Sequence, residues 1–258
     1  MLCSAGRSII VGGARAGAMG GLSTVGTIIR STTTATTTRP KTSAAGIAEE
    51  RAAGPSTTPF SIAIDGNIGS GKSTLLGLLK TQLDHSGKTI TFKPERTQEW
   101  KGMLPLYYED TERWSFPFQM QVLLSHLKNH SEAMKENSDV LIVERSPLAA
   151  RFVFGELLRQ ESLITEVESG LFDEFMKEVA WIPSAIVYLD CSPEVCLDRV
   201  KRRSREGEGI PLDYLRKVDA AYARFLSETS VPVIRIDSSG EIGDIFGAVQ
   251  SEIDKLLS

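Results

Sequence analysis

Cysteine and histidine are both scarce in this sequence of 258 residues. There are three of each, at Cys3, Cys191, Cys196, His85, His126 and His130. They are too few and too scattered for a disulfide framework or for the ligand spacing of a zinc site. A reducing intracellular compartment fits this usage.

Long apolar runs are absent as well. No stretch of about 18 or more apolar residues occurs, which argues against a membrane-spanning helix and against a membrane partner. Apolar residues make up 41% of the chain and charged residues 24%, the balance of a soluble globular protein. The length suits one α/β domain with additional sequence.

Acidic residues are missing from positions 1–48, which carry five basic ones. The remaining 24 basic and 33 acidic residues give residues 49–258 a net charge of −9. An acidic body of this kind argues against nucleic acid as a general partner.

Residues 1–59 are rich in Ser, Thr, Gly and Ala, with a Ser/Thr tract over 31–38. This composition, basic and free of acid over most of its length, predicts an organellar transit peptide and linker. Mitochondrion is the first expectation and plastid the second. A disordered tail without a targeting role is the alternative.

From Phe60 onward, short apolar runs alternate with longer segments of helical period. Strands are expected at 60–64, 89–92, 140–143, 185–189 and 233–236. Helices are expected at 72–84, 111–136, 148–180, 193–206, 211–227 and 241–257. Continuous apolar strands separated by helices predict an α/β fold, a three-layer domain over 60–258 with a five-stranded parallel sheet and helices on both faces.

A phosphate-binding loop follows the first strand. Residues 66–73 read GNIGSGKS and match G-x-x-x-x-G-K-[ST], between a strand and a helix as that motif requires. Lys72 is expected to reach the β- and γ-phosphates of ATP, and the Ser73 hydroxyl to bind Mg²⁺. The ATP phosphates are assigned to Gly66, Asn67, Ile68, Gly69, Ser70, Gly71, Lys72, Ser73 and Thr74.

Two further strands end in charged residues. The second runs into Glu95 and the third into Glu144 and Arg145. Because ligands of open α/β sheets lie beyond the carboxyl ends of the strands, these side chains are expected beside the loop. One carboxylate could then serve as a base and the other lie near the metal.

A basic segment predicts a lid over the phosphates. Five of the seven residues in 199–205 are basic, and two glycines then break the helix before it restarts near Leu212. Arginines at the tip of such a lid can stabilise the charge of a transferring phosphoryl group. A solvated helix face is the alternative.

Taken together, these motifs closely resemble the deoxynucleoside kinase family. The resemblance runs from Phe60 to about Asp237, and separated motifs carry it in the family's order. They are residues 66–74, Pro94-Glu95 with Trp100, Phe118-Gln119, Glu144-Arg145-Ser146, and the lid from Arg203 to Leu212. The implied reaction moves the ATP γ-phosphoryl group to the 5′-hydroxyl of a deoxynucleoside. Because members of this family are commonly dimers, the resemblance also implies a homodimer.

The resemblance assigns roles to individual residues. Glu95 matches the catalytic carboxylate and Arg145 the arginine beside it, while Glu144 matches the acidic residue near Mg²⁺. The catalytic set is completed by Lys72 and by two lid arginines, Arg203 and Arg205. Tyr108 and Glu208 match the pair that binds the sugar 3′-hydroxyl. The pocket walls match Trp100, Phe118 and Phe154, for which plain core packing is the alternative.

The same resemblance assigns recognition of the base to Gln119. Its amide offers a donor and an acceptor side by side, so an amide flip could accept thymine or cytosine. Val122 and His126 share its helical face and are expected near the base.

Two departures bear on specificity. Deoxycytidine and deoxyguanosine kinases carry Arg where this chain has His126, and Asp where it has Ala150. Ala150 resembles the thymidine and broad-specificity members, whereas His126 matches neither group. Pyrimidine deoxynucleosides are therefore expected, thymidine first, with a broad or purine preference as the alternative. Gly207 stands where members of the family often carry an acidic residue.

Two other functions compete with this interpretation. A nucleoside monophosphate kinase of the thymidylate type shares the loop and the fold, but Glu95 would repel an acceptor phosphate. A non-catalytic accessory subunit of respiratory complex I resembles the family, yet it needs none of the intact loop, carboxylate and lid residues.

Overall fold

A computed structural model describes residues 58–83, 87–179, 181–203 and 209–258. The predicted leader therefore lies outside the described residues, apart from Thr58 and Pro59. The predicted lid tip, which includes Arg205 and Glu208, also lies outside them.

Five parallel strands form one sheet in the order β2-β3-β1-β4-β5. They are β1 (Phe60–Gly66), β2 (Ile90–Lys93), β3 (Val140–Glu144), β4 (Ala185–Asp190) and β5 (Val233–Asp237). The central strand β1 is buried from Ser61 to Gly66. This confirms the expectation from its nearly continuous apolar run, since a central parallel strand is covered on both faces.

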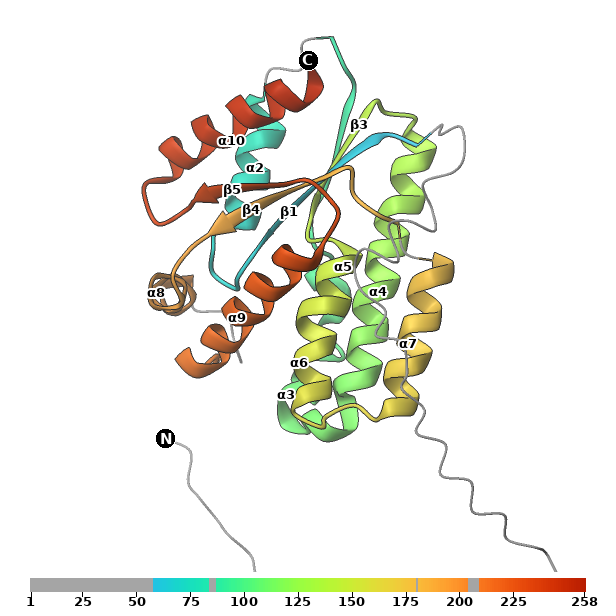
Figure 1. The fold of residues 1–258 in the computed structure, drawn as a ribbon. Coiled ribbons are helices and arrows are strands. Elements are labelled where there is room, and N and C mark those ends of the chain that lie inside the picture. The colour runs from blue at the N-terminus through green and yellow to red at the C-terminus, as the bar shows by residue number, and fades with distance from the viewer. Residues whose placement is uncertain (1–57, 84–86, 180, 204–208) are drawn as a thin grey trace, which may run out of the picture. The chain divides into compact units, whose positions relative to one another are not determined.

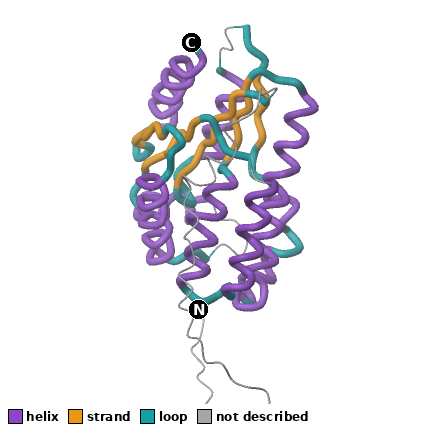
Figure 2. Tube along the Cα trace, turned by 45° about the vertical axis from the view of Figure 1, so that its right-hand side comes forward, coloured by secondary structure: helices purple, strands orange, loops and turns teal. Residues whose placement is uncertain are grey.

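Helices cover both faces of the sheet, as Figures 1 and 2 show. On one face, α2 (Lys72–Gln82) and α10 (Ile242–Leu257) pack on side chains such as Ile62, Ile64 and Val187. On the other, α4 (Thr111–Glu136), α7 (Glu166–Val179) and α9 (Leu212–Glu228) pack on Ala63, Leu141 and Ile186. Alternate residues of each strand thus feed two separate cores, and the predicted three-layer fold is confirmed.

The predicted helix over 148–180 is wrong in detail. The chain forms α5 (Pro147–Ala149), a π-helical turn η2 (Ala150–Gly155) and α6 (Glu156–Gln160), and then turns before α7. Ser162 adopts a left-handed backbone conformation with φ 57°, which ends the first segment. Thr165 and Glu168 then cap the start of α7 with reciprocal side-chain-to-backbone hydrogen bonds.

Smaller elements complete the fold. A 3₁₀ turn η1 (Thr97–Trp100) and helix α3 (Leu104–Glu109) lie between β2 and α4 and were not predicted. Helix α8 (Pro193–Arg203) follows β4 and packs against α9 and the loop after β1 through Cys196, Leu215 and Ile68. No helix in the described ranges has both the length and the apolar character needed to cross a membrane.

Strand order explains how distant sequence motifs meet. Strand β3 lies between β1 and β2, with Glu144 paired to Ile64 and Val143 paired to Lys93. Because the strands are parallel, the residues that follow all three emerge at one sheet edge.

Candidate active site

The loop between β1 and α2 has the backbone that its glycines permit. Gly69 has φ 89°, and a Cβ there would lie 2.4 Å from the carbonyl oxygen of Cys196 in α8. Gly71 has φ 99° immediately before α2 begins at Lys72. These conformations direct the free N–H groups at the start of α2 into the loop, where a phosphate can bind them.

Lys72 folds back over this loop. Its buried Nζ donates to the carbonyl oxygens of Gly66 at 3.2 Å and Asn67 at 2.7 Å. Burial lowers the pKa of Lys72 to about 7, and the positive charge of Arg145 adds to the effect. The buried Ser70 hydroxyl has no partner among the described residues. An ammonium and a hydroxyl of this kind fit the oxygens of a bound triphosphate.

Glu144 joins two other predicted site residues. Its Oε1 accepts a hydrogen bond of 2.6 Å from the Ser73 hydroxyl, and its Oε2 accepts one of 3.3 Å from the Glu95 backbone N–H. Oxygen ligands of this type are those that Mg²⁺ prefers, usually with phosphate oxygens and water completing its shell. Ser73 and Glu144 therefore fit the predicted cation.

Glu95 and Arg145 form a largely buried ion pair. Arg145 Nε lies 3.0 Å from Glu95 Oε1, and the two side chains are only 8% and 17% exposed. Burial raises the pKa of Glu95, while the Arg145 guanidinium opposes the rise and the Glu144 carboxylate adds to it. The pair thus combines a carboxylate of increased basicity with a cation that fixes its orientation.

Arg145 has further contacts that the sequence did not predict. Its Nη1 donates to the Gly66 carbonyl oxygen at 2.9 Å and to the Tyr222 hydroxyl at 2.7 Å. Tyr222 donates in turn to Asp65 at 3.2 Å. Asp65 could have been identified from the sequence, because it is an aspartate in an otherwise apolar strand. Nothing in the sequence distinguishes Tyr222 from an ordinary core position of α9.

Four predicted pocket residues form one apolar cluster beside this site: Trp100, Phe118, Val122 and Ala150. Trp100 meets Phe118 edge to face at 5.6 Å, and its Nε1 donates to Ser125 at 2.9 Å. Tyr107, which was not predicted, stacks on Phe118 at 5.0 Å. The structure therefore brings these four residues together in one packed cluster.

Two predicted residues lie outside this cluster. Phe154 is half-buried in the larger core, with the guanidinium carbon of Arg145 4.9 Å from its ring centroid. Tyr108 is 43% exposed on α3, and its ring lies 5.6 Å from that of Tyr107.

Gln119 and His126 are both buried on α4. Gln119 Oε1 and His126 Nε2 have no hydrogen-bond partner within the described part of the chain. Burial lowers the pKa of His126 to about 4, with a smaller contribution from the charge of Arg145, so the imidazole is neutral at physiological pH. Such orphaned polar atoms are costly unless a ligand meets them.

Two basic residues of the predicted lid, Arg199 and Arg203, lie in different surroundings. Arg203 ends α8 and is exposed. Arg199 points inward instead: it donates to the carbonyl oxygens of Ser238 at 2.7 Å and Ser70 at 3.4 Å. Arg199 therefore joins α8 to the phosphate loop and to the segment after β5.

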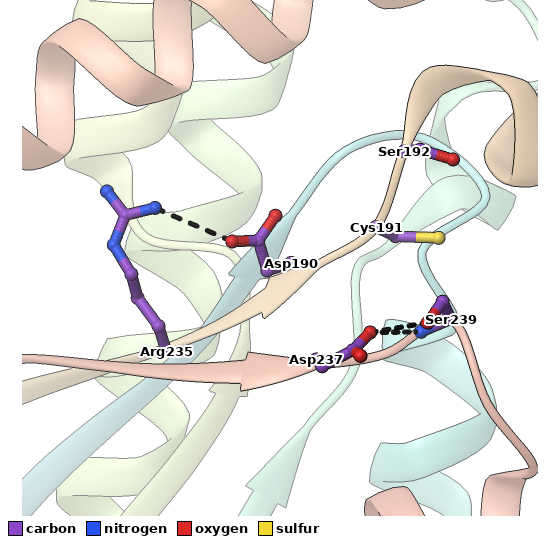
Figure 3. Close-up of a pocket in the computed structure, with 6 residues that line it drawn as sticks. All are labelled: Asp190, Cys191, Ser192, Arg235, Asp237 and Ser239. Atoms are coloured by element: carbon purple, nitrogen blue, oxygen red, sulfur yellow. Dashed lines mark hydrogen bonds and ion pairs between the residues drawn. The ribbon is translucent and has the colours of Figure 1, made fainter.

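A separate recess of about 420 Å³ opens at the carboxyl ends of β4 and β5 (Figure 3). It is lined by Asp190, Cys191, Ser192, Arg235, Asp237 and Ser239. A hydrogen bond with Cys196, together with the charge of Arg199, lowers the pKa of Cys191 to about 7. Strand order places this recess on the other side of β1 from Glu95 and Glu144.

A complete phosphate-binding loop and a buried carboxylate–arginine pair at the same sheet edge define the class: a P-loop phosphotransferase. A profile of the family described as deoxynucleoside kinase matches residues 62–257, most of the chain. The chain belongs to the deoxynucleoside kinase family.

Curated relatives agree with this assignment. The chain is 30% identical to the mitochondrial thymidine kinase 2 of Homo sapiens over 207 residues, 76% of this chain and 77% of the relative. It is 29% identical to a probable deoxycytidine kinase of fowlpox virus, covering 71% and 80% of the two chains. It is 26% identical to the deoxycytidine kinase of Homo sapiens, covering 76% and 90%. The protein is thus a nucleoside kinase, an ATP-dependent phosphotransferase. This assignment favours a catalytic role over that of a non-catalytic accessory subunit.

Proposed function

We propose that the protein phosphorylates the 5′-hydroxyl of pyrimidine deoxynucleosides, with thymidine and deoxycytidine as its substrates. The observation that carries the proposal is the pair of orphaned atoms, Gln119 Oε1 and His126 Nε2, on the buried face of α4. The amide and the neutral imidazole each offer one donor and one acceptor. Either can turn to meet the keto edge of thymine or the amino edge of cytosine.

Ala150 and His126 bear on the preference among bases. Ala150 is buried in the cluster with Trp100, Phe118 and Val122. Neither Ala150 nor the neutral His126 supplies the charged pair of the cytidine- and purine-directed members, which favours thymidine over deoxycytidine and over the purine deoxynucleosides. Phe154 and the aromatic cluster would enclose the base on its faces.

We propose the following roles for the remaining residues in the reaction. Glu95, held by Arg145, would orient the 5′-hydroxyl and accept its proton as the oxygen attacks the γ-phosphorus. The bond from the γ-phosphorus to the bridging oxygen would break at the same time, with ADP as the leaving group. Lys72 would leave its loop carbonyls and bind the phosphates, and Arg203 and Arg205 would stabilise the charge on the transferring group. Tyr108 and Glu208 would bind the 3′-hydroxyl.

Mg²⁺ would be held by Ser73 and Glu144, whose oxygens already lie 2.6 Å apart. When bound, the cation neutralises phosphate charge and fixes the triphosphate for transfer. Glu144 also accepts from the Glu95 backbone, so the same carboxylate links the metal side to the acceptor side.

The test is a substrate panel with the full chain and ATP–Mg²⁺. Thymidine, deoxycytidine, deoxyadenosine and deoxyguanosine are compared, with thymidylate as the phosphorylated control. Turnover of the two pyrimidine nucleosides is expected. A purine preference would overturn the roles of His126 and Ala150, and turnover of thymidylate alone would overturn the acceptor site.

A homodimer is proposed as the assembly. Val167, Leu171 and Phe175 form an exposed apolar stripe at helical spacing on α7, and Leu124 of the neighbouring α4 is also exposed. Adjacent apolar side chains of this kind mark interaction surfaces, and a second copy is the partner that the family expectation supplies. Sedimentation should give twice the monomer mass, and Leu171→Asp should give monomers.

A mitochondrial address is proposed for residues 1–59. The absence of acidic residues from 1–48 supports it, as does the name of the thymidine kinase relative. A fluorescent protein fused to residues 1–59 should enter mitochondria, with plastid import as the contradicting result. The matched control is a fusion in which the five basic residues of 1–48 are replaced by Gln.

A further inference from the structure

A buried hydrogen-bonded chain lies behind the catalytic ion pair. Arg145 donates through Nη1 to Tyr222, Tyr222 donates to Asp65 Oδ1, and the Ser146 hydroxyl donates to Asp65 Oδ2 at 3.0 Å. Tyr222, Asp65 and Ser146 are all fully buried. The Asp65 carboxyl and the Arg145 guanidinium are thereby linked through a single tyrosine hydroxyl.

The backbone of Arg145 explains why such a support is needed. Arg145 has φ 63°, in the left-handed region, directly after β3, and its N–H donates to the Ile64 carbonyl oxygen at 3.0 Å. A residue other than glycine in this conformation is strained, and the strain persists only where surrounding contacts hold it. The conformation turns the side chain toward Glu95 and the phosphate loop together.

Helix α9 carries this support into the site. Leu215 and Tyr222 are two turns apart on one buried face of α9. Leu215 accepts a hydrogen bond of 2.9 Å through its carbonyl oxygen from Asn67 of the phosphate loop. The same helix therefore fixes the loop at one point and the arginine at another.

We infer that Tyr222 and Asp65 are positioning residues of the phosphoryl transfer, which keep the Arg145 guanidinium on Glu95 by binding it through Nη1. The inference rests on the proposed function, in which the Glu95–Arg145 pair orients the acceptor hydroxyl. It assigns catalytic consequence to a buried residue on α9 that acts through Arg145. Because proximity effects depend steeply on geometry, loss of one anchor should reduce turnover more than binding.

The test begins with Tyr222→Phe, which removes the hydroxyl and keeps the ring. We expect kcat to fall roughly 10- to 100-fold while the KM values for ATP and nucleoside change less than about twofold. Tyr188→Phe is the matched control, since Tyr188 is a buried tyrosine whose ring lies 5.3 Å from that of Tyr222 in the core. It should keep wild-type kcat. A folded Tyr222→Phe variant with wild-type kcat would overturn the inference.

A double-variant cycle separates positioning from general destabilisation. In an Arg145→Lys background, Tyr222→Phe should change kcat by less than about twofold, because the group that it positions is gone. Equal fold-losses in both backgrounds would mean that Tyr222 acts by another route. Asp65→Asn, which keeps the side-chain shape, should reproduce the Tyr222→Phe loss and serves if that variant does not fold.

A crystal structure of Tyr222→Phe decides the inference without any assay. Separation of Arg145 Nε from Glu95 Oε1, now 3.0 Å, supports it, and an unchanged pair overturns it. If the wild-type protein phosphorylates no deoxynucleoside, the proposed function fails, and this structure still decides whether Tyr222 positions Arg145.

Discussion

The Ser73 hydroxyl donates a hydrogen bond of 2.6 Å to Glu144, 71 positions further along the chain. The contact exists because β1 and β3 are neighbours, so the helix after one strand begins beside the last residue of the other. It brings a hydroxyl and a carboxylate oxygen together where Mg²⁺ is proposed to bind.

Glu144→Gln should weaken the cation site. The amide keeps the size of the side chain but loses the charge that attracts Mg²⁺, so the Mg²⁺ concentration for half-maximal activity should rise at least about tenfold, the scale seen when metal-site shells are altered. Titration of Mg²⁺ at fixed ATP measures this. Glu136→Gln, which removes a surface carboxylate paired with Lys93, should leave the titration unchanged.

Glu95→Gln should separate binding from chemistry. The variant keeps a hydrogen-bonding group beside Arg145 but cannot accept the proton of the acceptor, so turnover should fall about 10²–10⁴-fold. Nucleoside affinity, measured by calorimetry, should stay within about threefold of the wild type. Retention of near-full kcat would remove Glu95 from the mechanism.

Gly69→Ala should damage the phosphate loop. The added Cβ would meet the Cys196 carbonyl oxygen at 2.4 Å, and the residue has φ 89°. Loop and α8 must therefore separate, and we expect ATP affinity to be lost and stability to fall by about 1–3 kcal/mol. Gly77→Ala in α2 is the control, because among the described residues no atom outside the neighbouring backbone of α2 lies within 4 Å of its Cβ position. It should be stabilising by up to about 1 kcal/mol. Calorimetric ATP binding and thermal unfolding measure both variants.

His126 should make the protein acid-sensitive. Its folded-state pKa of about 4 lies below the ordinary value of 6.5, so the unfolded chain binds the proton first as pH falls. Stability should therefore be lost progressively between about pH 6.5 and pH 4, to a total of about 3 kcal/mol.

Urea unfolding across this range, compared between wild type and His126→Met, isolates the effect from other titrating groups. The difference in unfolding free energy should shift in favour of the variant as pH falls. Two curves that stay parallel would show that His126 titrates alike in both states.

Much of the fold and part of the site follow from local patterns. Apolar strands ending in Glu95 and Glu144 predict a common location because parallel strands share an edge, and the two residues do meet there through a hydrogen bond. The phosphate loop is equally local, since its glycines, Lys72 and Ser73 are contiguous.

Other features depend on tertiary structure that the sequence does not display. Tyr222 occupies a regular buried position of α9, and only the packing of that helix on β1 brings its hydroxyl to Arg145. The break at Ser162 was missed because serine carries neither the flexibility of glycine nor the restriction of proline. The π turn over Ala150–Gly155 likewise has no period that a helical pattern would reveal.

The folded-back position of Lys72 has a consequence for nucleotide entry. Its ammonium donates to the Gly66 and Asn67 carbonyl oxygens, so the loop itself satisfies this buried cation. In the proposed site, nucleotide binding by Lys72 would therefore exchange these two backbone acceptors for phosphate oxygens. The net gain from this lysine in nucleotide affinity would then be the difference between two sets of hydrogen bonds.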